Sequence, residues 1–206
     1  MTTAQDAVAD LHSLLSTAEE TGPYVLVGHS YGGLVVRLYA SAHPADVAGL
    51  VLVDALSEDL PNGLTSTQQA LFEAINTPPP DTDAEVLDLQ ATFQQLRESP
   101  PVPQVPTIVL TADKPQLTKK ALAKTLAKGQ FPAGADQEYA DALWASQLAA
   151  QDKLAKKFPG AEHITDTNSS HYIQVYNPQL VSDSIRGVVE AQRDGEKTVG
   201  RVKGAD

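Results

Sequence analysis

Short, continuous apolar runs alternate along the chain with longer segments in which apolar residues recur every three or four positions. The runs predict buried strands, and the wider spacing predicts amphipathic helices. Strands that are hydrophobic throughout are typical of a parallel sheet covered by helices on both faces. The pattern therefore predicts the α/β fold class, with a parallel sheet of about four strands. The predicted strands are residues 24–27, 47–53, 105–111 and 161–165.

Helical spacing and helix-stop signals define the segments between these strands. The sequence Thr21-Gly22-Pro23 ends the first helix, and Asn177 followed by Pro178 begins the last one. The predicted helices are residues 3–20, a segment that ends at residue 42, and residues 65–76, 84–97, 117–128, 137–158 and 178–192.

Residues 57–103 interrupt the alternation, because they hold two predicted helices, separated by Thr77-Pro78-Pro79-Pro80, and no strand. We predict a helical cap insertion at 57–103, a core formed by residues 1–56 and 104–192, and a frayed polar tail at 193–206. An insertion of this kind either roofs an active site or decorates the surface. The sequence favours neither alternative.

The first predicted strand leads directly into Gly28-His29-Ser30-Tyr31-Gly32, and a helical pattern follows at once. This is the G-x-S-x-G elbow in its expected context of strand, sharp turn and helix. We predict a positive φ at Ser30, a steric need for glycine at both Gly28 and Gly32, and a hydroxyl that stands clear of the sheet. The Tyr31 N–H, at the head of the helix, would stabilise a developing oxyanion.

Three more residues with reactive side chains follow predicted strands, namely Asp54, Asp113 and His171. The carboxyl ends of parallel strands meet at one edge of a sheet, so these groups should gather beside Ser30. The chain order serine, acid, histidine is the one that the elbow mechanism expects. Of the five histidines, only His171 lies in a small-residue loop between a strand and a helix. It is therefore the predicted general base, oriented by one of the two aspartates.

The segments GPYVLVGHSYGG, AGLVLVDA, VPTIVLTAD and NSSHYIQVYNPQLVSDSI resemble the later portion of an α/β-hydrolase-fold serine hydrolase. The resemblance covers residues 22–189. It implies an esterase, lipase or amidase-like enzyme that cleaves a small ester through an acyl-enzyme and needs neither a cofactor nor a metal. A serine at the elbow disfavours the epoxide hydrolase and haloalkane dehalogenase branches, which carry aspartate there.

The resemblance leaves the acid open between two residues. Most members of the family place it after the strand that follows the cap, which matches Asp113, whereas a minority place it one strand earlier, which matches Asp54. Asp54 has a competing structural role as a cap of the following turn, and a long helical segment separates Asp113 from the histidine. We favour Asp113 slightly. Glu58 and Asp59 lie further into the cap and are weaker candidates.

The chain departs from the resemblance before the elbow. A full fold has about eight strands and an early loop that supplies a second oxyanion donor, whereas only one helix precedes residues 24–27 here. The Tyr31 N–H then lacks a partner donor, and the strand becomes an apolar edge. Truncation, a homodimer through this edge, or a complementing chain would each explain the pattern. Two other functions compete with ester hydrolysis. One is that of a non-catalytic relic that acts in interaction or assembly. The other is peroxidase-like or acyl-transfer chemistry that needs no cofactor.

The amino-acid composition limits the kinds of molecule that the protein is expected to bind. A net charge of −11 argues against nucleic acid and anionic membranes. No apolar stretch is long enough to span a membrane, and the N-terminus lacks the pattern of a secretory signal, so we expect a cytoplasmic protein that binds a small-molecule ester. The absence of cysteine excludes disulfides and thiolate chemistry. The expected pocket walls come from the cap and are Leu64, Leu71, Phe72, Ile75 and Phe93.

Overall fold

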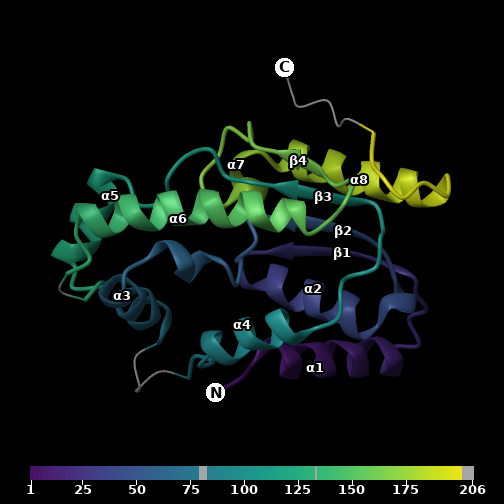
Figure 1. Ribbon diagram of the computed structural model, residues 1–206, viewed down its shortest axis with the longest axis horizontal. Coiled ribbons are helices and arrows are strands. Elements are labelled where there is room, and N and C mark those ends of the chain that lie inside the picture. The colour runs from purple at the N-terminus through teal and green to yellow at the C-terminus, as the bar shows by residue number, and fades with distance from the viewer. Residues whose placement is uncertain (79–82, 133, 201–206) are drawn as a thin grey trace.

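Four parallel strands form the centre of the molecule (Figure 1). In the computed structural model, which describes residues 1–78, 83–132 and 134–200, they lie in the order β1-β2-β3-β4. All pairs are parallel, so the carboxyl ends of the strands lie at one edge of the sheet. The predicted α/β class and the four predicted strands are confirmed. Their bounds are β1 (Tyr24–His29), β2 (Val47–Val53), β3 (Thr107–Leu110) and β4 (Glu162–Ile164).

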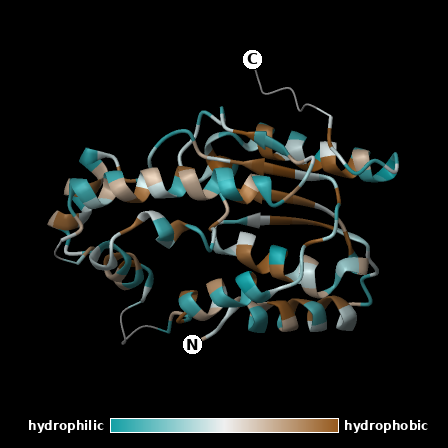
Figure 2. Ribbon diagram, in the orientation of Figure 1, coloured by the Kyte–Doolittle hydropathy of each residue, from teal (hydrophilic) through white to brown (hydrophobic). Residues whose placement is uncertain are grey.

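Alternate side chains of the central strands pack into two separate cores. Leu50 and Leu52 of β2 belong to the core on one face, while Val51 and Val53 belong to the core on the other. Every residue of β2 and β3 is buried, which explains why their side chains are hydrophobic apart from Thr107. Figure 2 shows the hydrophobic strands between helices whose outer sides are hydrophilic.

Helices cover both faces of the sheet (Figure 1). One face is covered by α1, α2 and α4, joined by Leu154 from the end of α6, and the other face is covered by α8. The approach of α8 is close, since a Cβ at Gly49 of β2 would lie 2.3 Å from a methyl carbon of Val188. The helix bounds are α1 (Ala4–Thr17), α2 (Tyr31–Ala42), α3 (Ser66–Asn76), α4 (Leu89–Glu98), α5 (Lys119–Ala127), α6 (Gln137–Lys156), α7 (Ile173–Tyr176) and α8 (Pro178–Arg193).

Polar side chains begin most of these helices. Each accepts a hydrogen bond from a backbone N–H of the first turn, which satisfies a group that has no partner within the helix. Asn177 acts in this way on α8, as its position before Pro178 predicts. The other caps of this kind are Thr3, Thr65, Asp88, Thr118 and Asp136.

The two helices of the predicted cap insertion have different surroundings. Phe93 and Leu96 of α4 are buried in the core that α1 and α2 share, so α4 belongs to the helical layer of the sheet. Helix α3 lies beyond the carboxyl edge of the sheet (Figure 1). Pro79 and Pro80, part of the predicted break between the two helices, lie outside the described residues.

The edge strand, an additional short helix and the C-terminal tail can also be compared with the predictions. Strand β1 lies at one end of the strand order, and Val27 within it is 43% exposed. Helix α7 was not predicted, and residues 201–206 of the predicted tail lie outside the described part of the chain. None of the helices in the described residues is long and apolar enough to cross a membrane.

Candidate active site

Ser30 occupies the sharp turn between β1 and α2. Its backbone has φ 51° and ψ −123°, the positive φ that the elbow predicts and that a non-glycine residue adopts only under strain. Two hydrogen bonds to the next strand region hold it: the Ser30 N–H donates to the Val53 carbonyl at 3.3 Å, and the Leu56 N–H donates to the Ser30 carbonyl at 2.9 Å.

Two glycines, Gly28 and Gly33, allow the chain to pass closely at this turn, and only Gly28 is one of the two that were predicted. A Cβ at Gly28 would lie 2.6 Å from the Gly32 carbonyl oxygen, and a Cβ at Gly33 would lie 2.3 Å from the Ala55 Cβ. A Cβ at Gly32 would meet nothing within 4 Å. The steric need predicted at Gly32 is therefore wrong, because this Cβ position faces open space.

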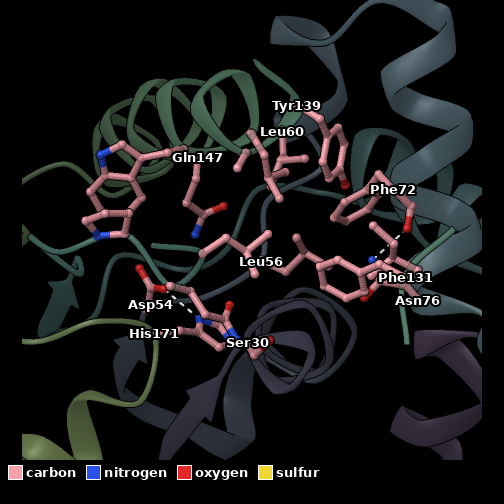
Figure 3. Close-up of a pocket in the computed structure, with 17 residues that line it drawn as sticks. Ser30, Asp54, Leu56, Leu60, Phe72, Asn76, Phe131, Tyr139, Gln147 and His171 are labelled. Atoms are coloured by element: carbon pink, nitrogen blue, oxygen red, sulfur yellow. Dashed lines mark hydrogen bonds and ion pairs between the residues drawn. The ribbon is translucent and has the colours of Figure 1, made fainter. Parts of the chain in front are cut away.

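Asp54 lies directly after β2 and contacts His171. Its Oδ2 is 2.7 Å from the imidazole Nδ1, and its Oδ1 accepts a hydrogen bond from the Ala112 N–H at 3.1 Å. Asp54 is 3% exposed, so its carboxylate depends on these two partners rather than on solvent. Figure 3 shows Asp54, His171 and Ser30 gathered at one end of a cavity.

Asp113 has a different environment, and the slight preference for it as the partner of His171 is not supported. Its carboxylate accepts hydrogen bonds from the backbone N–H groups of Asn168, at 3.1 Å, and Ser169, at 2.7 Å. Asp113 therefore orders the loop that carries the histidine. Asp54 lies beside Ser30 because β2 pairs directly with β1, and the loop that follows β4 brings the His171 ring to Asp54.

His29 supports His171 from the other side. Its Nε2 lies 2.9 Å from the His171 carbonyl oxygen, to which it donates, and the two ring centroids are 4.6 Å apart. Burial lowers the pKa of His29, although the hydrogen bond to the carbonyl opposes this effect. The sequence placed His29 beside the nucleophile but did not reveal its bond to the His171 backbone.

Ser30 and His171 line the same cavity, of about 290 Å³, so the elbow and the histidine loop meet as predicted. Across the described part of the chain, no hydrogen bond joins the Ser30 hydroxyl to the His171 ring. Catalytic hydrogen bonds are often long in the absence of substrate and tighten when it binds. Both side chains line one cavity, which is the arrangement that proton transfer between them requires.

Apolar side chains form most of the cavity wall, and they come from more of the chain than the predicted cap. Phe72 and Ile75 of α3 line it as expected, whereas Phe93 lies in the core beneath the sheet. Leu64 and Leu71 are not among the lining residues either. The unpredicted part of the wall comes from Leu56, Leu60, Asn76, residues 115–117, Phe131, and the α6 residues Tyr139, Ala140, Leu143, Trp144 and Gln147.

Tyr139 brings a polar atom to this apolar wall. The residue is 2% exposed, and its hydroxyl has no hydrogen-bond partner among the residues that the structure describes. Burial raises its pKa to about 12, so the hydroxyl stays protonated at neutral pH. It can therefore donate a hydrogen bond to a polar group of a bound molecule.

The backbone N–H and the side chain of Tyr31 lie in different surroundings. As the first residue of α2 it presents its N–H at the helix N-terminus, where the partial positive charge of the helix attracts an anion. Its side chain packs against the core formed by α1, α2 and α4. The nearby Leu56 N–H already donates to the Ser30 carbonyl, so it is not available as a second oxyanion donor in this conformation.

Glu58 and Asp59, the weaker candidates for the acid, belong to an ion-pair network instead. Glu58 accepts two hydrogen bonds of 2.9 Å from the Arg37 guanidinium, and it also contacts Lys157. Asp59 lies 2.8 Å from Lys157. Burial alone would raise the pKa of Glu58, but the two cations outweigh it and hold the pKa at about 2. This network joins α2 and the end of α6 to the segment after Asp54.

Known proteins share parts of this sequence and this fold. The sequence matches the model of the alpha/beta hydrolase family over residues 2–187. An uncharacterised protein of Bacillus subtilis, YqjL, is 42% identical over 52 residues, which are 25% of this chain and 21% of that protein. A protein of Schizosaccharomyces pombe is 44% identical over 45 residues, 22% of this chain and 8% of that protein. The chain thus matches only a minor part of the length of these relatives.

Solved structures share the fold at low identity. A carboxylesterase of Nitrososphaera gargenis superposes with a TM-score of 0.52 at 13% identity, covering 94% of this chain and 74% of the other. A protein of Pseudomonas aeruginosa described as a probable hydrolytic enzyme gives 0.51 at 16% identity, covering 90% and 69%. Since the family match spans residues 2–187 of a chain of 206, this protein belongs to the alpha/beta hydrolase family.

Proposed function

We propose that this protein is a serine hydrolase that cleaves a small carboxylic ester, with Ser30 as nucleophile, His171 as general base and Asp54 as the triad acid. The observation that carries the proposal is the 2.7 Å contact between Asp54 Oδ2 and His171 Nδ1, at a cavity that Ser30 also lines. A buried carboxylate on Nδ1 leaves Nε2 as the nitrogen that can accept a proton.

The reaction proceeds through an acyl-enzyme. His171 Nε2 takes the proton of the Ser30 hydroxyl while the oxygen attacks the ester carbonyl, and the Tyr31 N–H stabilises the oxyanion. The protonated imidazole then gives its proton to the departing alcohol, and the acyl group remains on Ser30. Water repeats the sequence, activated by the same ring, and releases the acid. Asp54 stabilises the imidazolium in both halves.

The cavity favours an uncharged substrate with a short or medium acyl chain. Its wall is mainly apolar, and among the described residues that line it only Asp54 and His171 have a carboxylate or an imidazole side chain. An ionised group in such a wall would lose its hydration without gaining a partner. The volume of about 290 Å³ lies near the lower limit for small-molecule sites.

A fluorophosphonate probe and short p-nitrophenyl esters test the proposal. We expect the probe to label Ser30, labelling to disappear in Ser30→Ala, and ester hydrolysis to disappear with it. The competing candidate is a non-catalytic member of the family, favoured by the missing hydrogen bond between Ser30 and His171 in the described structure. An unlabelled, folded protein without esterase activity would support that candidate and reject ours.

We also propose that the free side of β1 pairs with another strand, from a second copy or from a complementing chain. The position of β1 at the end of the strand order and the exposure of Val27 support this proposal. Analytical ultracentrifugation at micromolar concentration is expected to show a species larger than a monomer, and Val27→Lys to reduce it. A monomer at all concentrations would contradict the homodimer.

A further inference from the structure

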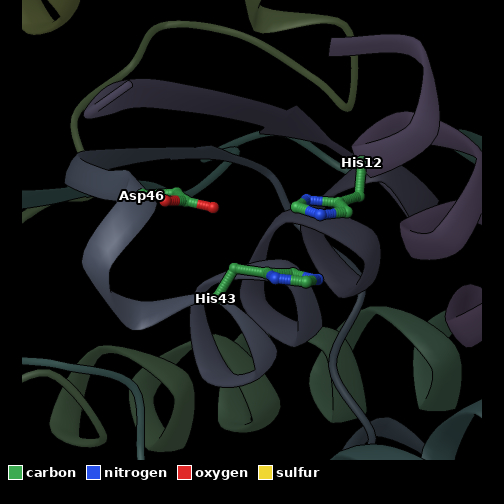
Figure 4. Close-up of side chains that lie close together, drawn as sticks. All are labelled: His12, His43 and Asp46. Atoms are coloured by element: carbon green, nitrogen blue, oxygen red, sulfur yellow. The ribbon is translucent and has the colours of Figure 1, made fainter. Parts of the chain in front are cut away.

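We propose that His12, His43 and Asp46 form a binding site for a divalent transition-metal ion, best suited to zinc, at the end of the sheet opposite to Ser30. One ligand atom from each residue lies within 4.8 Å of the others. Figure 4 shows the two imidazole rings face to face, with the Asp46 carboxylate extending toward them. Two imidazoles and a carboxylate are a ligand set that zinc uses in proteins.

Three separate elements bring these side chains together. His12 lies in the second half of α1, His43 directly follows the last residue of α2, and Asp46 ends the 3-10 helix η1 (Pro44–Asp46) that leads into β2. The turn between α2 and β2 is closed by backbone hydrogen bonds, with the His43 N–H donating to the Tyr39 carbonyl at 2.8 Å and the Asp46 N–H to the His43 carbonyl at 3.0 Å. The fold therefore holds two of the ligands on one short turn.

Tyr39 and His43 both contact the His12 ring. Its Nδ1 lies 3.4 Å from the hydroxyl of Tyr39, which is fully buried, and its plane stacks on that of His43 with centroids 4.1 Å apart and an angle of 8°. A hydrogen bond of the kind made with the Tyr39 hydroxyl orients metal-binding histidines. Zinc binding requires an adjustment in which the two rings turn out of this stack, because the nitrogen lone pairs lie in the ring planes, and in which the donor atoms reach the separation of roughly 3.4 Å that tetrahedral zinc with bonds of about 2.0–2.1 Å sets. All three side chains are half-buried and can make it.

The site is separate from the proposed catalytic centre. Asp46 immediately precedes β2 and Asp54 immediately follows it, so a strand length of roughly 20 Å lies between the two carboxylates. A metal here would act on the structure rather than on the ester reaction. Helix α1 has its buried residues, Ala4 and Val8, in its first half. A metal bound by His12 would fasten the second half of α1 to the α2–β2 turn.

Isothermal titration of the full chain with Zn²⁺, after treatment with EDTA, tests the site directly. We expect about one equivalent to bind with a Kd below roughly 10 μM. Asp46→Asn and His12→Gln should each weaken binding by more than about tenfold, since even loss of an outer-shell partner costs 10–100-fold. At 100 times the Kd, zinc should raise the Tm of the wild type by roughly 5–10 °C.

Two control variants separate this site from others. Asp10→Asn removes an exposed carboxylate of the same helix and should bind zinc like the wild type. His171→Gln removes the imidazole of the candidate active site and should also leave the affinity unchanged. Zinc binding that survives in Asp46→Asn and His12→Gln, or that is lost in His171→Gln, would overturn the proposal. So would the absence of binding at 100 μM zinc.

Discussion

The buried pair of Glu58 and Arg37 provides a measurable dependence of stability on pH. Both side chains are almost fully buried, at 3% and 4% exposure. The contacts with Arg37 and Lys157 hold the pKa of Glu58 at about 2, against an ordinary value of 4.5. Each pKa unit corresponds to about 1.4 kcal/mol, so the ionised carboxylate contributes about 3 kcal/mol to the free energy of unfolding at neutral pH.

The direction of the effect follows from the lowered pKa. Because the folded pKa lies below the unfolded value, the stabilisation is complete above pH 4.5 and is lost progressively as the pH falls toward about 2. Glu58→Gln removes the charge but keeps the shape, and it leaves the Arg37 guanidinium buried without its counter-ion. We expect a loss of about 3 kcal/mol at pH 7, in the range measured for breaking a buried ion pair.

Urea unfolding of the wild type and Glu58→Gln between pH 7 and pH 2.5 isolates this contribution, because other carboxylates titrate equally in both proteins. The difference between the two free energies of unfolding should shrink from about 3 kcal/mol at pH 7 to less than about 1 kcal/mol near pH 2.5. A difference that stays constant with pH would refute the argument, since it would show that packing and not ionisation carries the effect.

Three further predictions concern the candidate site. Asp54→Asn should lower kcat for a p-nitrophenyl ester by about 10⁴, whereas Asp113→Asn should act more weakly, through the histidine loop; the reverse order would assign the acid to Asp113. Gly28→Ala should destabilise the protein by about 1–3 kcal/mol in thermal unfolding, because the new Cβ would collide with the backbone. Gly32→Ala should instead stabilise it by up to about 1 kcal/mol, because its Cβ would face open space within a helix. Equal effects of the two substitutions would contradict this geometry. Tyr139→Phe should raise the stability in urea by about 1 kcal/mol, because it removes a buried hydroxyl without a partner in the described structure; a loss would show that the hydroxyl is satisfied.

The chain pattern by itself determined the elements and the nature of the site. Apolar runs identify strands because a strand buried on both faces needs hydrophobic residues throughout, and β2 was predicted with its observed bounds. The strained turn at Ser30 was predictable for the same reason, since its conformation depends on neighbours in sequence. The α/β class and the meeting of Ser30 with the His171 loop followed from these local signals.

Only the tertiary structure decided which distant residues touch. Asp54 and Asp113 both follow strands, and their roles depend on how the loop at 167–171 bends toward one or the other. The cavity wall contributed by α6, and the place of α4 beneath the sheet, likewise depend on how helices pack after the strands have paired. The periodicity of apolar residues predicts which face of a helix is buried. It does not predict which element packs against that face, because many elements can cover the same apolar surface.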